Sequence, residues 1–171
     1  MIGDVTDKGI PAALVMASTR GLLRSIAYQF VSPGEVLKAV NQALCADIPQ
    51  GMFVTRLYAV LDTATGKIAY ANAGHNLPYH RTDGGISEFY ATGMPLGLMP
   101  EMAYEQKEDV LRPGDCLLLY SDGLVEAHNR SREMFGEPRL RQLLQAQNPA
   151  GPGLLKCVLE PLGNRKMTSP W

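Results

Sequence analysis

The pattern of apolar and polar residues changes near residue 50 of the chain. Before that point, apolar residues recur at helical spacing from residue 10 to about residue 28, and again from residue 32 to residue 44. Pro11 near the start of the first stretch, and Ser32 at the start of the second, are typical of helix N-termini. We therefore predict two consecutive helices, preceded by a short strand at residues 1–5.

From residue 52 onward the pattern is that of β-strands. Two stretches, residues 52–62 and 67–73, flank the turn T-A-T-G and predict a β-hairpin. Turns at residues 83–85 and 112–115 bracket shorter strands, and C-L-L-L-Y after the second turn predicts a fully buried strand. A last helix is expected around residues 137–145. This order predicts an α+β domain built on antiparallel sheet, not a βαβ repeat.

Composition narrows the class of protein. The chain has 171 residues, 46% hydrophobic and 19% charged, which suits one ordinary soluble domain. Its formal net charge of −1 gives no electrostatic reason to expect nucleic acid or an anionic membrane as a partner. No apolar run approaches the roughly 20 residues that span a bilayer. The three cysteines are widely spaced and lack a C-x-x-C motif, which favours a reducing cytoplasm over a disulfide framework.

Two aspartates are the main candidates for chemistry. Asp4 lies in M-I-G-D-V-T-D-K-G, and Asp122 ends the apolar run in C-L-L-L-Y-S-D-G. An apolar run that stops beside glycine places a carboxylate at the rim of a buried strand, where it can meet a divalent cation. The alternative role is a turn cap, which is the commonest use of aspartate beside glycine.

A series of further short motifs accompanies these aspartates between residue 2 and about residue 145. They are I-G-D-V-T-D-K-G-I-P-A-A-L, S-P-G-E-V-L, G-M-F-V-T, Y-A-N-A-G-H-N-L-P, M-P-L-G-L, L-R-P-G-D, L-L-L-Y-S-D-G-L-V-E-A and M-F-G-E-P-R-L. Any one of them alone is a weak signal, but together and in this order they are highly specific. In them the chain resembles the bacterial PPM-type (PP2C-like) serine/threonine phosphatases of the SpoIIE and RsbU kind.

This resemblance implies a fold and a metal-dependent activity. The expected fold is a PP2C-like two-sheet antiparallel β-sandwich flanked by helices, with two Mn²⁺ or Mg²⁺ ions at one end. The metal ligands implied for this chain are the carboxylate of Asp4, the carbonyl oxygen of Val5 and the carboxylate of Asp122. A metal-activated water would attack phosphorus, so no protein nucleophile is required.

The chain also departs from the family pattern. The family takes a further aspartate from an upstream G-G-D-like strand, and this sequence begins too late to contain it, so we expect a domain truncated at its N-terminus. The family's C-terminal D-D-I-T-like motif is missing as well. At position 7 the family usually has glycine, so Asp7 puts a bulkier, charged residue into the turn beside the expected metals.

The last residues lose all clear periodicity, which divides the chain into a partial PPM-type domain at residues 1–145 and an irregular tail at residues 146–171. Residues 166–171, with the last base of the Arg165 codon, can be written in codons whose other reading frame encodes E-D-D-I-T-L. We therefore hypothesise that this tail is out of frame. Nucleotides that encode the motif in no frame would refute the hypothesis.

The resemblance implies partners too. The expected substrate is a phosphorylated anti-anti-sigma protein of the STAS type, and an upstream sensor domain would belong to the intact protein. A homodimer is left open. The alternative function is a catalytically incomplete remnant that binds a phosphoprotein or a sensor.

The chain has three histidines. For His75 a structural hydrogen bond is favoured over a contact with phosphate, and His80 and His128 are expected at the surface.

Overall fold

The structure, a computed structural model, describes residues 1–129 and 131–146, and the expected tail beyond residue 146 lies outside the described residues. The chain divides into two compact units, each made of two segments. The first unit comprises Met1–Leu77 and Tyr90–Arg112, and the second comprises Pro78–Phe89 and the described residues from Pro113 onward.

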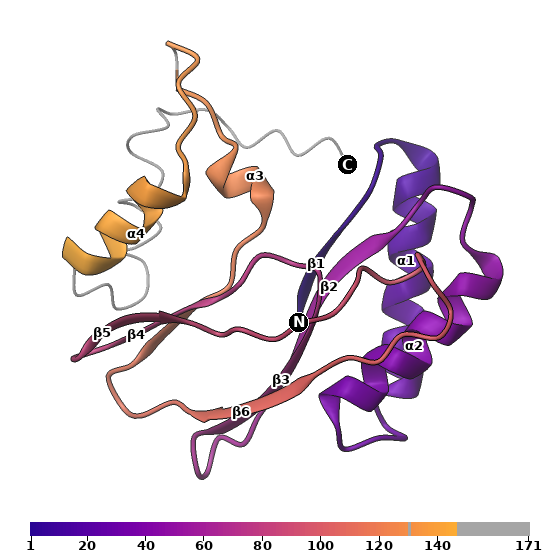
Figure 1. The fold of residues 1–171 in the computed structure, drawn as a ribbon, viewed down its shortest axis with the longest axis horizontal. Coiled ribbons are helices and arrows are strands. Elements are labelled where there is room, and N and C mark those ends of the chain that lie inside the picture. Colours follow the sequence, from indigo (N-terminus) through magenta and orange to yellow (C-terminus); the bar gives the residue numbers. More distant parts are fainter. Residues whose placement is uncertain (130, 147–171) are drawn as a thin grey trace. The chain divides into compact units, whose positions relative to one another are not determined.

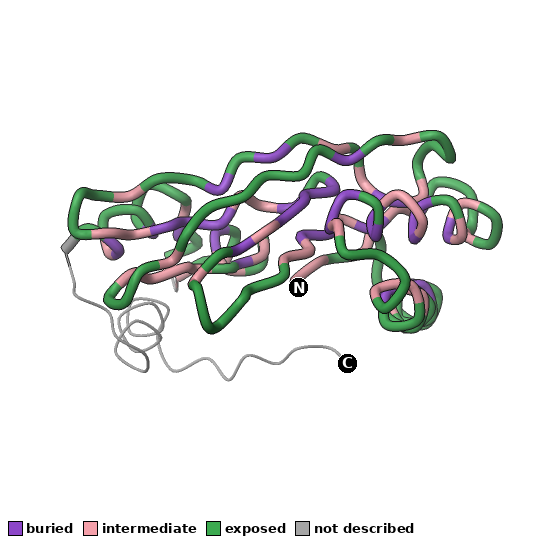
Figure 2. The backbone as a smooth tube through the Cα atoms, turned by 90° about the horizontal axis from the view of Figure 1, so that it is seen from below, coloured by how far each residue is buried: buried purple, intermediate pink, exposed green. Residues whose placement is uncertain are grey.

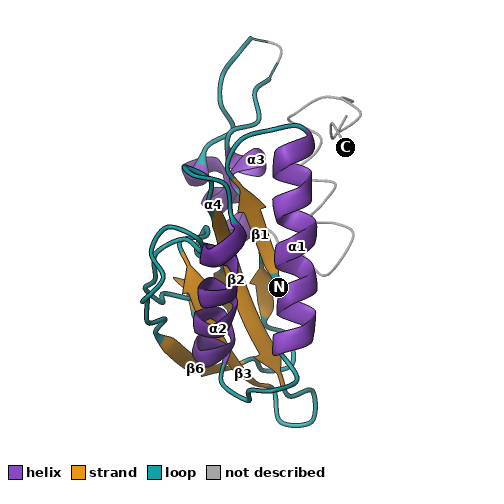
Figure 3. Cartoon of the chain, turned by 90° about the vertical axis from the view of Figure 1, so that its right-hand side faces the viewer, coloured by secondary structure: helices purple, strands orange, loops and turns teal. Residues whose placement is uncertain are grey.

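The first unit is a four-stranded antiparallel sheet with two helices on one face (Figures 1 and 3). Its elements are β1 (Ile2–Val5), α1 (Ile10–Ile26), α2 (Pro33–Asp47), β2 (Val54–Leu61), β3 (Lys67–Ala73) and β6 (Gln106–Val110). The strand order is β1-β2-β3-β6, so β1 is an edge strand. Asp4 on β1 lies directly opposite Thr55 on β2.

Both helices begin as the sequence predicts. Helix α1 has Gly9 as its N-cap with φ of 86°, a conformation that glycine adopts without strain, and Pro11 in its first turn. Helix α2 is capped by Ser32, whose hydroxyl accepts a hydrogen bond from the Glu35 N–H. Because both helices present apolar residues at helical spacing, they bury one face each against the sheet.

The core of the first unit fills the space between these helices and the sheet. Its most deeply buried members include Leu23, Leu37, Val40, Val54, Ala71 and Leu96. Buried positions, purple in Figure 2, are interspersed with exposed positions, green, along much of the backbone. The fully buried Asn41 ties α2 to the loop at residues 97–100, since its amide donates to the Met99 and Pro100 carbonyls and accepts from the Gly97 N–H.

The second unit is a three-stranded antiparallel sheet with two helices. Its elements are β4 (Tyr79–Thr82), β5 (Gly85–Glu88), β7 (Cys116–Leu118), α3 (Asp122–Val125) and α4 (Glu137–Ala146), and the strand order is β5-β4-β7. Its apolar cluster includes Phe135, Leu140 and Leu144, together with Tyr79 and Tyr120, whose rings stack with centroids 5.6 Å apart.

Most element predictions are confirmed, and one is wrong. The expected α+β class with antiparallel sheets is present, as are the strand at residues 1–5, both helices, the hairpin and the last helix. The strand predicted from C-L-L-L-Y is shorter and less buried than expected, because only Cys116–Leu118 is strand, all three residues are half-buried, and Leu119 is exposed. Among the described residues, no helix is long and apolar enough to cross a membrane.

Candidate metal centre

Asp4 projects an exposed carboxylate from the edge strand β1. Its Oδ1 accepts a hydrogen bond of 2.9 Å from the N–H of the next residue, Val5. This local bond holds the carboxylate close to the backbone and leaves Oδ2 without a hydrogen bond among the described residues. An exposed carboxylate oxygen beside a strand end is a suitable ligand for a hard divalent cation.

The Val5 carbonyl oxygen is also available as a metal ligand. In an antiparallel pair, hydrogen-bonded and non-hydrogen-bonded residue pairs alternate along the strands. The Thr6 N–H donates to the Phe53 carbonyl, whereas Val54, the partner of Val5, exchanges both of its backbone bonds with Leu96. The Val5 carbonyl is therefore not used in the β1–β2 ladder and points from the open edge of β1.

The turn after β1 fixes the direction in which these two ligand candidates face. Thr6 forms three hydrogen bonds with Phe53. Its N–H and its hydroxyl both donate to the Phe53 carbonyl, and the hydroxyl accepts from the Phe53 N–H. Asp7 then adopts a left-handed conformation with φ of 70°, and Gly9 follows with φ of 86°. Glycine adopts such a left-handed backbone without strain, whereas an L-residue such as Asp7 does not.

Gly3 is required for a different reason. A Cβ at this position would lie 2.4 Å from the Thr55 carbonyl oxygen and 2.8 Å from both Cδ and a terminal nitrogen of Arg56. The buried Arg56 side chain thus lies directly against the strand that carries Asp4. Burial lowers the pKa of the Arg56 guanidinium from its ordinary value.

Asp122 lies in the second unit, at the start of α3. Ser121 is the N-cap of this short helix, and the Asp122 Oδ1 accepts a hydrogen bond of 2.7 Å from the Gly123 N–H. The Asp122 side chain is exposed and, like that of Asp4, bonds only to the neighbouring backbone among the described residues. Both aspartates thus use one carboxylate oxygen locally, as the turn-cap alternative requires, and retain a second oxygen for a ligand.

The three predicted ligands are divided between the units: Asp4 and Val5 belong to the first unit and Asp122 to the second. Among the described residues, no group of three His, Cys, Asp or Glu side chains is placed to hold a metal ion. Such a group does not include backbone carbonyls, which hard cations bind readily. The donor set therefore fits an oxygen-liganded cation better than zinc.

Thr55 is a residue that the sequence reasoning missed. Its hydroxyl oxygen lies 3.3 Å from the Asp4 nitrogen, 3.4 Å from the Asp4 carbonyl oxygen and 2.9 Å from Nδ1 of His75. His75 is buried, and its hydrogen bonds follow the structural role favoured from the sequence. Thr55 stands in the motif G-M-F-V-T, but nothing in that motif indicates that it contacts Asp4, 51 residues away in the sequence.

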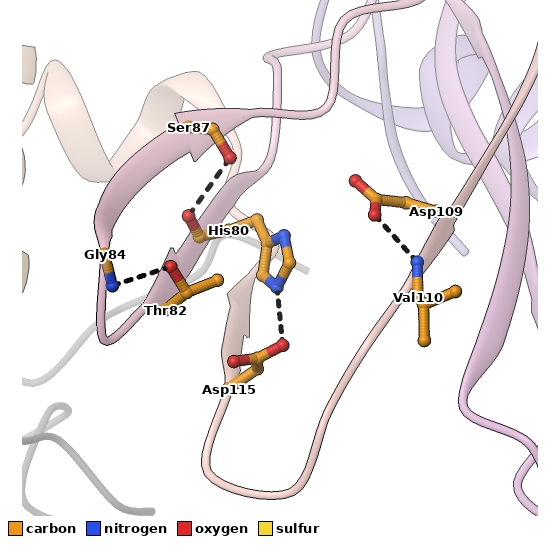
Figure 4. A network of polar contacts seen from close by, with 7 residues as sticks. All are labelled: His80, Thr82, Gly84, Ser87, Asp109, Val110 and Asp115. Carbon is orange, nitrogen blue, oxygen red and sulfur yellow. Dashed lines mark hydrogen bonds and ion pairs between the residues drawn. The ribbon is translucent and has the colours of Figure 1, made fainter.

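The expectation that His80 lies at the surface is wrong. Its side chain is 6% exposed, and Nε2 lies 3.1 Å from Oδ2 of Asp115, whose side chain is 10% exposed (Figure 4). The ring also meets Phe89 edge-on, with centroids 5.2 Å apart. The polar–apolar pattern of a four-residue strand gave no indication that the turn at residues 112–115 would supply a carboxylate. His128 is exposed, as expected.

Comparison with known proteins identifies the family. The family model described as "Stage II sporulation protein E (SpoIIE)" matches residues 1–167. The phosphoserine phosphatase RsbU of Bacillus subtilis is 33% identical over 147 residues, which cover 84% of this chain and 43% of RsbU. The chain thus spans less than half the length of this relative.

Solved structures show the same fold. The RsbU and RsbW domains of Rv1364c from Mycobacterium tuberculosis match 94% of this chain and 47% of that one, with 28% identity and a TM-score of 0.71. RsbX, solved with magnesium, matches 96% of this chain and 73% of its own at 17% identity, with a TM-score of 0.68. The catalytic domain of PstP, solved with two manganese ions, matches 95% of this chain and 81% of its own at 14% identity, with a TM-score of 0.65.

The order of motifs, the antiparallel α+β fold and the match over nearly the whole chain agree with one another. This chain belongs to the SpoIIE family of PP2C-like phosphatases.

Proposed function

We propose that this chain is a metal-dependent phosphatase domain that hydrolyses phosphoserine or phosphothreonine in a protein substrate. The observation that carries the proposal is the pairing of an exposed Asp4 carboxylate with the outward Val5 carbonyl at the edge of β1. In a chain of the SpoIIE family, this pair has the oxygen chemistry that Mn²⁺ and Mg²⁺ take as ligands.

Each of the three candidate ligands has a proposed role in holding metal ions. Asp4 and Val5 would hold Mn²⁺ or Mg²⁺ from the first unit, and Asp122 would hold the second ion of the pair. When bound, such ions lower the pKa of a bound water and screen the charge of the phosphate. The hydrogen bonds from the Val5 and Gly123 N–H groups orient the two carboxylates before any ion arrives. No serine, cysteine or histidine nucleophile is needed.

The proposed substrate is a phosphorylated anti-anti-sigma protein of the STAS type, in partner-switching signalling. Support comes from RsbU, whose name states that it acts on phosphoserine, and from the structure that joins RsbU and RsbW domains in Rv1364c. A cytoplasmic location accords with such a substrate. A sensor domain that controls the phosphatase would belong to a longer protein.

The test is release of inorganic phosphate from a phosphoserine STAS protein, and from a phosphoserine peptide, in the presence of Mn²⁺. Asp4→Asn and Asp122→Asn are expected to lower kcat/KM by about 100-fold or more, because each removes a charged metal ligand with little change of shape. Asp83→Asn is the matched control, since it removes an exposed turn aspartate outside the proposed site.

The outcomes separate the two candidate functions. Phosphate release that requires both Asp4 and Asp122, and not Asp83, supports the phosphatase. Tight binding of the phosphorylated protein without phosphate release would instead support the non-catalytic remnant. Release that survives both site substitutions would refute the ligand assignment.

A further inference from the structure

A chain of hydrogen bonds connects the candidate ligand strand to the end of β3. The links run from the backbone of Asp4 to the Thr55 hydroxyl, from that hydroxyl to His75, and from His75 to Asn72. Thr55 is 51 residues from Asp4 in the sequence and 20 from His75, so the network is tertiary structure, not local turn geometry.

The first link lies on the edge strand. Asp4 and Thr55 are directly opposite each other in the β1–β2 pair, so their side chains project from the same face of the sheet. The Thr55 hydroxyl is within 3.4 Å of both the nitrogen and the carbonyl oxygen of Asp4. It therefore adds side-chain contacts to the backbone of a four-residue edge strand that has a partner on one side only.

The second link is the shortest contact of the hydroxyl, 2.9 Å to Nδ1 of His75. A hydroxyl has one hydrogen to donate and two lone pairs. If Nδ1 accepts that hydrogen, the Thr55 oxygen accepts from the Asp4 N–H. If Nδ1 carries its own hydrogen, the hydroxyl donates to the Asp4 carbonyl. Either neutral tautomer of His75 keeps the network continuous.

The third link holds the backbone of His75. Asn72 is 1% exposed, and its amide forms a reciprocal pair of bonds with the His75 backbone, each 2.8 Å long. Gly74 between them has φ of 69°, and a Cβ there would lie 2.8 Å from Pro95. The backbone that carries the imidazole is therefore held by a tightly packed loop with buried hydrogen bonds.

We propose that Thr55 and His75 are positioning residues that hold the Asp4–Val5 ligand pair in place for metal binding. The inference rests on the proposed function, in which Asp4 and Val5 bind the ion. An edge strand frays readily because half of its backbone groups have no partner strand. By anchoring the Asp4 backbone from β2, the network keeps the carboxylate and the neighbouring carbonyl in one geometry.

The first test removes the hydroxyl. Thr55→Val keeps the shape of the side chain, Thr55→Ser keeps the hydroxyl, and Thr65→Val is the control because it deletes a threonine hydroxyl that bonds Asp62 in the β2–β3 turn. Mn²⁺ affinity is measured directly from the electron paramagnetic resonance of free Mn²⁺. Thr55→Val should weaken binding about 10- to 100-fold, as is typical for groups that orient metal ligands, while Thr55→Ser restores it. Thr65→Val should leave it unchanged.

The second test asks which ring nitrogen of His75 acts. His75→Asn can place a polar atom near the position of Nδ1, whereas His75→Gln reaches toward the position of Nε2. The proposal requires that Asn retains Mn²⁺ affinity within about threefold and that Gln loses about as much as Thr55→Val. Equal losses in both variants would overturn the assignment to Nδ1.

A double-mutant cycle joins the two tests. Because Thr55 and His75 act through one path, Thr55→Val combined with His75→Gln should weaken Mn²⁺ binding no more than the worse single variant does. Amide hydrogen exchange in the metal-free protein supplies a second readout, since Thr55→Val should speed exchange at Asp4 while the Leu37 amide in α2 is unaffected.

The results distinguish the two proposals. Wild-type protein that binds Mn²⁺ no better than Asp4→Asn would refute the proposed site, and the positioning role with it. Wild-type binding that depends on Asp4 but is equal in Thr55→Val and Thr55→Ser would overturn the positioning role alone. Additive losses in the double variant would also overturn it.

Discussion

At the scale of single residues, Asp7 is one of two described non-glycine residues with a left-handed backbone, the other being Arg132. The φ of Asp7 is 70°. We predict that Asp7→Gly raises the free energy of unfolding by up to about 1 kcal/mol. The substitution relieves a backbone strain of about 1–2 kcal/mol. This gain outweighs the cost of about 0.5–1 kcal/mol that arises because glycine loses more backbone entropy on folding. Urea denaturation measures the change.

The control for this prediction is Asp83→Gly. Asp83 is also a turn aspartate, but its φ is not positive, so glycine there should lower stability through the entropy term alone. Equal effects of the two substitutions would contradict the strain argument.

Tyr104 presents a buried hydroxyl without a hydrogen-bond partner among the described residues. Its ring packs against Gly93, where a Cβ would lie 2.6 Å from the ring carbon Cδ1. We predict that Tyr104→Phe raises the free energy of unfolding by about 1 kcal/mol, because it removes an unsatisfied polar group and keeps the ring.

Burial raises the pKa of Tyr104 above its ordinary value of 10.0, with a smaller contribution from Cys45. The folded protein therefore holds this proton more tightly than the unfolded chain does. Stability from this proton is present below pH 10.0 and is lost as the pH rises further. In denaturation series at several pH values, the difference in free energy of unfolding between Tyr104→Phe and wild type should grow above pH 10.0, in favour of the variant. A constant difference would contradict this origin.

Residue-scale predictions from the sequence were possible where the signal is local. Asp4 and Asp122 were singled out because a carboxylate beside glycine at the end of an apolar run is visible in one motif. Thr55 and the buried His80–Asp115 pair were missed because their partners lie far away in the sequence. Long-range partners of this kind have no signature in a single sequence.

At the scale of elements, the N-terminus of α2 combines a cap with a tertiary contact. The Ser32 hydroxyl accepts from the Glu35 N–H at 3.4 Å and donates to Oε1 of Gln106 at 2.6 Å. We predict that Ser32→Ala lowers the free energy of unfolding by about 1 kcal/mol. Thermal unfolding tests this against Ser18→Ala, an exposed position inside α1, where alanine should be neutral or slightly stabilising.

The helices and the hairpin could be predicted because their periodicity and turn chemistry are local. The buried strand expected from C-L-L-L-Y could not, because apolar content does not reveal how many residues will find a partner. Only Cys116–Leu118 pairs with β4, and Leu119 beyond it is exposed. The strand therefore ends where its pairing with β4 ends, although the apolar run continues.

At the scale of the whole molecule, the sequence indicated no boundary before residue 146, whereas the described chain clusters into two units that each combine distant segments. The β3–β6 pairing, for example, joins Lys67 to Val110. Sheet order depends on such pairings, which a hydrophobic pattern cannot specify. The pattern predicted an α+β domain on antiparallel sheet, and the family resemblance added the expectation of a PP2C-like fold.

The central claim is that this chain uses metal ions held by Asp4, Val5 and Asp122 to hydrolyse a phosphate ester. Its most direct test is a Mn²⁺ titration of aryl phosphate hydrolysis by the folded chain, beside Asp122→Asn with the same circular dichroism spectrum. We predict that hydrolysis rises with Mn²⁺, stops when the ion is chelated, and is reduced about 100-fold or more in Asp122→Asn. Hydrolysis whose rate depends on neither Mn²⁺ nor Asp122 would contradict this claim. So would a folded chain that hydrolyses no aryl phosphate at saturating Mn²⁺.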